Sequence, residues 1–132
     1  AYVTWSTAVG AGVCVDGRLS RDKNGNAGNA GYTFVVDDDS NALCGCGNVE
    51  GLAARSAMVR RFGQTAPQLF AAAGRGEPAT LATTETLCRI VGRMLVAILD
   101  LQRISLGGGV FWHNRDFLLP RLQAQSTAVF PC

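Results

Sequence analysis

The chain has 132 residues, a length that suits one domain large enough to bury a real core. Its hydrophobic content of 48% and charged content of 17% are typical of a packed globular domain and exclude a disordered chain. The net charge of +2 is too small to indicate nucleic-acid or anionic-membrane contact, and no apolar run is long enough to span a membrane. The opening residues 1–5 have neither a basic start nor the apolar region of a signal peptide.

The first part of the chain reads as short strands separated by glycine-rich turns. Strands are predicted over residues 2–5, 13–19 and 32–36. The middle one is a β-hairpin, because Asp16-Gly17 is typical of a two-residue type I′ turn. A loop is expected over residues 22–31, either a ligand-contacting loop or a plain surface one. Residues 37–41 are interpreted as a solvated polar turn rather than a metal site.

From residue 49 the hydrophobic period changes toward 3.6 residues, which indicates helices. Helices are predicted over residues 52–60, 66–73, 78–98 and 116–125, with Pro120 near the first turn of the last one. A short strand is expected over residues 102–106, just before three glycines. Strands, then helices, then a strand–glycine–helix unit predict an α/β domain.

Two glycine turns about a hundred residues apart suggest the two sides of one nucleotide cleft. The first glycine turn is residues 6–12 and the second is residues 107–109. Glycine lets the backbone approach a ligand closely and present N–H groups to phosphate. Either turn could instead be a tight connection without a ligand, and neither matches a P-loop or a dinucleotide fingerprint. The candidate phosphate- and nucleotide-binding residues are Thr7, Gly10, Gly12, Gly107, Gly108 and Gly109.

Five cysteines at scattered positions do not suggest a secreted disulfide scaffold, so we expect a cytoplasmic protein. Cys14 and Cys88 lie in apolar patterns and are predicted to be buried thiols. The single histidine, His113, is interpreted as a surface or loop residue.

The order of the motifs resembles the ROK family of sugar kinases and sugar-responsive repressors, whose motifs are GTGxGxG, a hairpin, AGxxGH, CxCGxxGCLE and DPxxIxxGGG. The resemblance spans about residues 2–125. The counterparts here are Ser6-Thr7-Ala8-Val9-Gly10-Ala11-Gly12, Val15-Asp16-Gly17-Arg18-Leu19, Gly25-Asn26-Ala27-Gly28-Asn29-Ala30-Gly31-Tyr32, Cys44-Gly45-Cys46-Gly47-Asn48-Val49-Glu50-Gly51-Leu52-Ala53 and Asp100-Leu101-Gln102-Arg103-Ile104-Ser105-Leu106-Gly107-Gly108-Gly109.

The resemblance implies the carboxy-terminal lobe of an actin-like ATPase (ribonuclease H-like) α/β fold, a mixed sheet packed with helices. Residues 1–132 would form this single domain, with the family's amino-terminal lobe absent. The implied function is the nucleotide-side lobe of an ATP-dependent hexose kinase, glucokinase-like, using ATP and Mg²⁺. No position matches the family's catalytic aspartate, so no turnover is expected from this chain alone.

Two other interpretations stay open. One is the sugar-sensing effector lobe of a ROK transcriptional regulator, and the other is a degenerate, non-catalytic interaction module. The resemblance also implies a homodimer, or pairing with the missing lobe.

The sugar and zinc motifs depart from the family pattern. By resemblance, Asn29 and Tyr32 occupy sugar-loop positions, and Tyr32 stands where the family has a zinc-binding histidine. The third zinc cysteine is replaced by Gly51 and a sugar-binding glutamate by Ala53. Cys44 and Cys46 are therefore the remnant of a zinc site that we expect to be unoccupied, since structural zinc takes four ligands.

Overall fold

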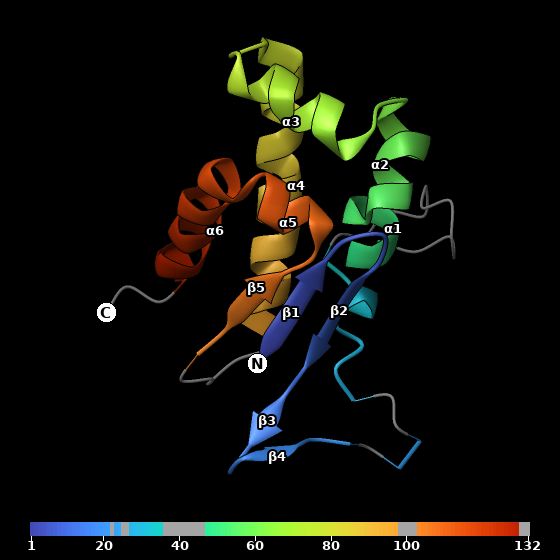
Figure 1. Cartoon of the computed structure of the whole chain (residues 1–132), viewed down its shortest axis with the longest axis vertical. Helices are drawn as coiled ribbons and strands as arrows, with labels where there is room; N and C mark the ends of the chain where they lie inside the picture. The colour runs from blue at the N-terminus through green and yellow to red at the C-terminus, as the bar shows by residue number, and fades with distance from the viewer. Residues whose placement is uncertain (22, 25–26, 36–46, 98–102, 130–132) are drawn as a thin grey trace.

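A three-stranded mixed sheet carries the candidate site (Figure 1). The computed structural model describes residues 1–21, 23–24, 27–35, 47–97 and 103–129, without the side chains of 126–129. The strands are β1 (Tyr2–Trp5), β2 (Val9–Gly12) and β5 (Ser105–Gly107), in the order β2-β1-β5. β1 pairs antiparallel with β2 and parallel with β5, with Trp5 opposite Val9 and Tyr2 opposite Ser105. The predicted mixed sheet is confirmed, although β5 begins later than expected.

The predicted hairpin is also confirmed, and it projects from the end of the molecule opposite α3 (Figure 1). β3 (Cys14–Val15) pairs antiparallel with β4 (Arg18–Leu19). Asp16 and Gly17 both have positive φ, 50° and 75°, as a type I′ turn requires. Cys14 is exposed on this hairpin, over which no described helix or strand packs, so the prediction of a buried thiol there is wrong.

No strand forms at the start of the predicted segment 32–36. Ala30–Tyr32 is instead the 3-10 helix η1, closed by the amide of Thr33 donating to the carbonyl of Ala30 at 3.0 Å. Only Phe34 makes an isolated bridge, to Asn48, so this segment has no partner strand among the described residues. Residue 36 and the predicted polar turn at 37–41 lie outside the described residues.

Six α-helices are found in the described residues, and one predicted helix is divided in two. The predicted helix at 52–60 is split because Ala54 is extended, with ψ 152°. Pro120 lies inside the last helix rather than near its first turn. No described helix is long and apolar enough to cross a membrane. The helices are α1 (Val49–Ala53), α2 (Arg55–Phe62), α3 (Ala66–Gly74), α4 (Pro78–Ala97), α5 (Gly109–His113) and α6 (Arg115–Val129).

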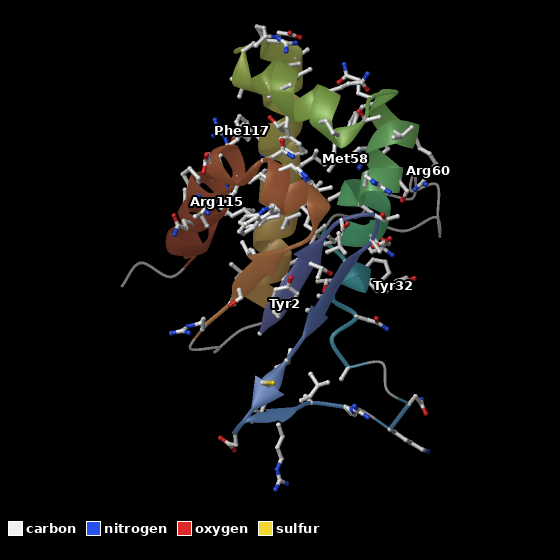
Figure 2. The ribbon with its side chains drawn as sticks, viewed as in Figure 1. Tyr2, Tyr32, Met58, Arg60, Arg115 and Phe117 are labelled. Atoms are coloured by element: carbon white, nitrogen blue, oxygen red, sulfur yellow. The ribbon has the colours of Figure 1, made fainter. Side chains whose placement is uncertain are left out.

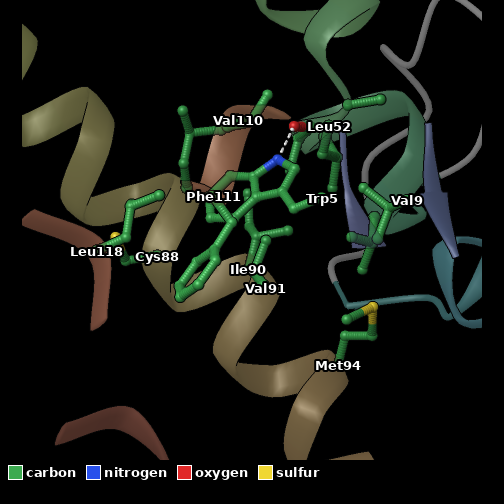
Figure 3. Close-up of a cluster of buried hydrophobic side chains, with 14 of the residues drawn as sticks. Trp5, Val9, Leu52, Cys88, Ile90, Val91, Met94, Val110, Phe111 and Leu118 are labelled. Carbon is green, nitrogen blue, oxygen red and sulfur yellow. Dashed lines mark hydrogen bonds between the residues drawn. The ribbon is translucent and has the colours of Figure 1, made fainter. Parts of the chain in front are cut away.

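Trp5 is a central residue of the core, which forms where the sheet meets the helices (Figure 3). Its ring packs edge-on to Phe70 at 6.2 Å between centroids, and its Nε1 donates to the carbonyl of Ala53 at 2.7 Å. α4 contributes a buried face that includes Cys88, whose burial raises the pKa of its thiol to about 12. The buried thiol predicted at Cys88 is confirmed, and its neutral form suits an apolar core.

Candidate functional site

The first glycine turn reverses the chain between β1 and β2 and is held by the corner between α1 and α2. The amide of Arg55 donates to the carbonyl of Ser6 at 3.0 Å, and the hydroxyl of Ser56 donates to the carbonyl of Thr7 at 3.5 Å. Thr7 and Ala8 at the tip are exposed. Ala8 does not have positive φ, so the alanine that replaces a family glycine causes no backbone strain there.

The second glycine turn lies against the first. Gly108 has φ 90°, and a Cβ placed on it would lie 2.5 Å from the carbonyl oxygen of Trp5. A Cβ on Gly109 would lie 3.7 Å from the hydroxyl of Ser6. The two turns meet because β1 and β5 are parallel, so their carboxyl ends lie at one edge of the sheet. Thr7, Gly108 and Gly109 are therefore gathered at this edge.

The other three predicted glycines lie within strands. Gly107 is the last residue of β5 and is buried. Gly10 and Gly12 belong to β2, opposite Thr4 and Tyr2 respectively. At about 3.4 Å per residue, Gly12 lies roughly 10 Å along the strand from Val9. Its place is therefore beside the hairpin rather than at the edge where the turns meet.

A cavity of about 470 Å³ opens where α5 follows the second glycine turn. Trp112, 64% exposed, is fixed there by its amide, which donates to the carbonyl of Gly108 at 2.8 Å. The Nδ1 atom of His113 donates to the carbonyl of Gly109 at 2.7 Å. The guanidinium of Arg115 lies 5.7 Å from the centroid of the Trp112 ring. The lining residues are Trp112, His113, Asn114, Arg115, Asp116 and Phe117.

The cavity combines an aromatic face with cationic and polar groups, and its volume is typical of a small-molecule site. His113 is exposed as expected, but its place in the cavity wall was missed, as were Trp112 and Arg115. The available signal was an aromatic residue and a cation within six residues of the glycine triplet.

The predicted sugar-loop residues lie on the other side of the sheet. Figure 2 places Tyr32 on the β2 side and Arg115 and Phe117 on the α6 side. Asn29 precedes η1 and is exposed, and Tyr32 is 61% exposed. The loop is joined to β2 by the amide of Ala11, which donates to the carbonyl of Gly28 at 2.7 Å. Both side chains are therefore accessible to a ligand.

Ala53 is fully buried, and its carbonyl is bonded to the Trp5 ring nitrogen. The position that the resemblance assigns to a sugar-binding glutamate therefore carries a methyl group inside the core. No polar side chain reaches a sugar from this position.

The described part of the zinc motif does not fit the metal. Structural zinc binds cysteine and histidine side chains, so neither Tyr32 nor Gly51 serves as a ligand. Two of the four zinc-ligand positions of the family motif are therefore lost. Cys44 and Cys46 lie outside the described residues, and no metal-binding group of His, Cys, Asp and Glu occurs within them. The start of α1 is instead stabilised by a hydrogen bond, in which the side chain of Asn48 accepts from the amide of Gly51 at 2.9 Å.

One carboxylate that sequence reasoning did not single out contacts the first glycine turn. The amide of Val9 donates to Oε2 of Glu50 at 2.6 Å. Glu50 is in the first turn of α1 and is half-buried. This contact joins two segments 41 residues apart, which no local pattern could have indicated.

Comparison with known proteins adds family evidence to this geometry. The ROK family model matches residues 1–129. Over 120 residues the chain is 34% identical to the N-acetylmannosamine kinase of Salmonella typhi, covering 83% of this chain and 40% of that kinase.

Two solved structures superpose over nearly the whole chain. The ROK hexokinase from Thermus thermophilus has a TM-score of 0.85 and 26% identity, over 98% of this chain and 47% of that one. The ROK family glucokinase from Streptomyces griseus, in complex with glucose and AMPPNP, has a TM-score of 0.72 and 24% identity, over 94% of this chain and 48% of that one. The actin-like ATPase fold expected from the sequence is confirmed, and the chain spans less than half the length of each relative.

Proposed function

Because this chain belongs to the ROK family, we propose that it is the nucleotide-side lobe of an ATP-dependent kinase acting on a hexose-type sugar. The observation that carries the proposal is the meeting of the two glycine turns beside the cavity. The nucleotide phosphates would lie at the tip of the first turn, near Thr7, and the nucleoside would extend past the second turn into the cavity. The resemblance to a glucokinase that holds AMPPNP supports this choice of ligand.

Chemically, the lobe would bind and orient the nucleotide. Exposed amides at the turn tips would donate to phosphate oxygens, and the face of Trp112 would stack on the base. Mg²⁺, when bound with the nucleotide, would neutralise phosphate charge. Among the described residues there is no cluster of three or more His, Cys, Asp or Glu side chains.

The sugar side of the proposal rests on fewer residues. Asn29 and Tyr32 would hydrogen-bond sugar hydroxyls, since both are exposed on the loop that the resemblance assigns to the sugar. The buried methyl group at Ala53 predicts weak sugar affinity. No residue of this chain matches the family's catalytic aspartate, so we propose no turnover by these 132 residues alone.

Tryptophan fluorescence tests the nucleotide proposal directly. Trp5 is buried and Trp112 is exposed, so a ligand in the cavity changes the emission of Trp112 selectively. We expect ATP to quench this emission saturably and Trp112→Phe to remove the signal while the protein stays folded. Tyr32→Phe, an exposed aromatic change on the other side of the sheet, should leave ATP binding unchanged. Absence of binding by calorimetry and fluorescence at millimolar ATP would refute the nucleotide role.

The effector lobe of a sugar-responsive regulator is the second candidate, because the solved ROK folds that resemble this chain include a transcriptional regulator as well as kinases. It requires sugar binding without nucleotide binding. Thermal unfolding with glucose, N-acetylmannosamine or ATP separates the two, because a ligand of the native state raises the melting temperature. A shift with ATP supports the kinase lobe, a shift with a sugar alone supports the effector lobe, and no shift supports the non-catalytic interaction module.

A further inference from the structure

The cavity after the second glycine turn has in its wall a histidine whose two ring nitrogens are in different situations. His113 ends α5, and its Nδ1 lies 2.7 Å from the carbonyl oxygen of Gly109. A carbonyl oxygen only accepts hydrogen bonds, so Nδ1 carries the proton of the neutral ring. The other nitrogen, Nε2, is then an acceptor with a free lone pair. The contact with Gly109 therefore fixes both the tautomer and the orientation of this ring.

The ring of His113 lies where the two glycine turns meet the cavity. A Cβ placed on Gly109 would lie 3.9 Å from Nδ1 of His113 and 3.7 Å from the hydroxyl of Ser6. Trp112, the preceding residue of α5, lines the same cavity and is 64% exposed. A base that stacks on Trp112 therefore has His113 beside one of its edges.

Other polar side chains of the cavity wall are already bonded within the protein. Nδ2 of Asn114 donates to the carbonyl of Val110 at 2.8 Å. Nε of Arg115 donates to Oδ1 of Asp116 at 3.4 Å, and a guanidinium offers donors only. Nε2 of His113 has no such partner among the described residues, so it can accept a hydrogen bond from a ligand.

We propose that His113 selects the base of the nucleotide and favours a 6-aminopurine over a 6-oxopurine; this inference rests on the proposed function. The 6-amino group of adenine would donate to Nε2 of His113. The 6-oxygen of hypoxanthine or guanine would instead bring one acceptor against another, and neither would have a donor. An unpaired polar group costs more than a missing hydrogen bond, so the 6-oxopurine is rejected rather than merely bound without help.

The size of the preference follows from the strength of one hydrogen bond. A net hydrogen bond changes a binding constant by about 2-fold to 10-fold, and an unpaired polar group by about 5-fold to 150-fold. The cavity is open to solvent beside Trp112, so water satisfies part of an unpaired group and the lower end applies. We expect ATP to bind about 5-fold more tightly than inosine triphosphate. Purine riboside triphosphate, which has only hydrogen at position 6, should fall between them.

Calorimetric titration of the complete 132-residue chain with these three triphosphates tests the proposal. His113→Phe keeps an aromatic ring without an acceptor, so ATP should bind more weakly, inosine triphosphate more tightly, and the preference should disappear. His113→Gln has an amide that both donates and accepts, so it should bind ATP and inosine triphosphate with equal affinity. If His113 only stabilised the end of α5, its replacement would change the affinities of all three ligands by the same factor.

Arg18→Gln is the control variant, because Arg18 is exposed on the hairpin and does not line the cavity. It should keep the wild-type order of affinities. The inference is overturned if the wild type binds ATP and inosine triphosphate equally, or if folded His113→Phe keeps the wild-type ratio of the two affinities; the proposed function survives either result. The wild-type comparison needs no variant, so a variant that fails to fold leaves the test intact. If none of the three triphosphates binds the wild type, the proposed function fails and the inference with it.

Discussion

Replacing Gly108 by alanine should destabilise this domain strongly, because the added Cβ is disfavoured both by the local backbone conformation and by overlap with neighbouring backbone atoms. Gly108 has φ 90° and ψ 156°, a region open essentially to glycine, and another residue pays about 1–3 kcal/mol to adopt it. The new methyl group would also lie 2.5 Å from the carbonyl oxygen, 2.7 Å from the carbonyl carbon and 2.8 Å from the nitrogen of Trp5. Backbone atoms of a central strand cannot move aside as a flexible side chain does.

Relieving that overlap adds about 1–3 kcal/mol, so the free energy of unfolding should fall by about 2–6 kcal/mol. A domain of this size has only about 5–15 kcal/mol in total. The melting temperature should therefore drop by about 7–20 °C. Circular dichroism during heating and in urea measures both quantities.

Gly109→Ala is the matched control, one residue along. Its φ is not positive, and the nearest atom to the added Cβ is the hydroxyl of Ser6 at 3.7 Å. Alanine at the start of α5 should change stability by less than about 1 kcal/mol, in either direction. The reasoning is refuted if Gly108→Ala unfolds within about 1 kcal/mol of the wild type, since the two turns would then not be in contact.

Three further outcomes are expected. Trp5→Phe removes the donor to the buried carbonyl of Ala53 and should cost about 2–4 kcal/mol of unfolding free energy in urea; a loss below about 0.5 kcal/mol would contradict the role of this bond. A chelator should leave the melting temperature unchanged, because two zinc ligands of the family motif are replaced by Tyr32 and Gly51; a drop on chelation, reversed by zinc, would show a metal site. At pH 8 a thiol reagent should label exposed Cys14 and spare native Cys88 by peptide mass mapping. Because the Cys88 pKa is raised from 9.0 to about 12, the stability from its neutral thiol is complete below pH 9 and lost as the pH rises toward 12.

Local patterns were enough to predict most of the elements. The strand at Tyr2–Trp5, the turn at Asp16-Gly17 and the helix Pro78–Ala97 follow from alternation, turn chemistry and a 3.6-residue period. These signals are short-range, so they need no knowledge of what packs where. The same local reasoning failed in the described part of the predicted strand, residues 32–35, where Tyr32 ends η1 and Phe34 makes only an isolated bridge to Asn48.

The sequence by itself determined the family, the α/β class and the identity of the two glycine turns, because these depend on residues close together in the chain. Only the tertiary structure decided which predicted residues meet. The parallel pairing of β1 with β5 brings Gly108 against Trp5, while the antiparallel pairing of β2 carries Gly12 away from the turn. The contact between Glu50 and Val9 depends likewise on how α1 packs on β2, 41 residues apart in the chain. Strand direction and helix packing are set by the whole core, so no local pattern encodes them.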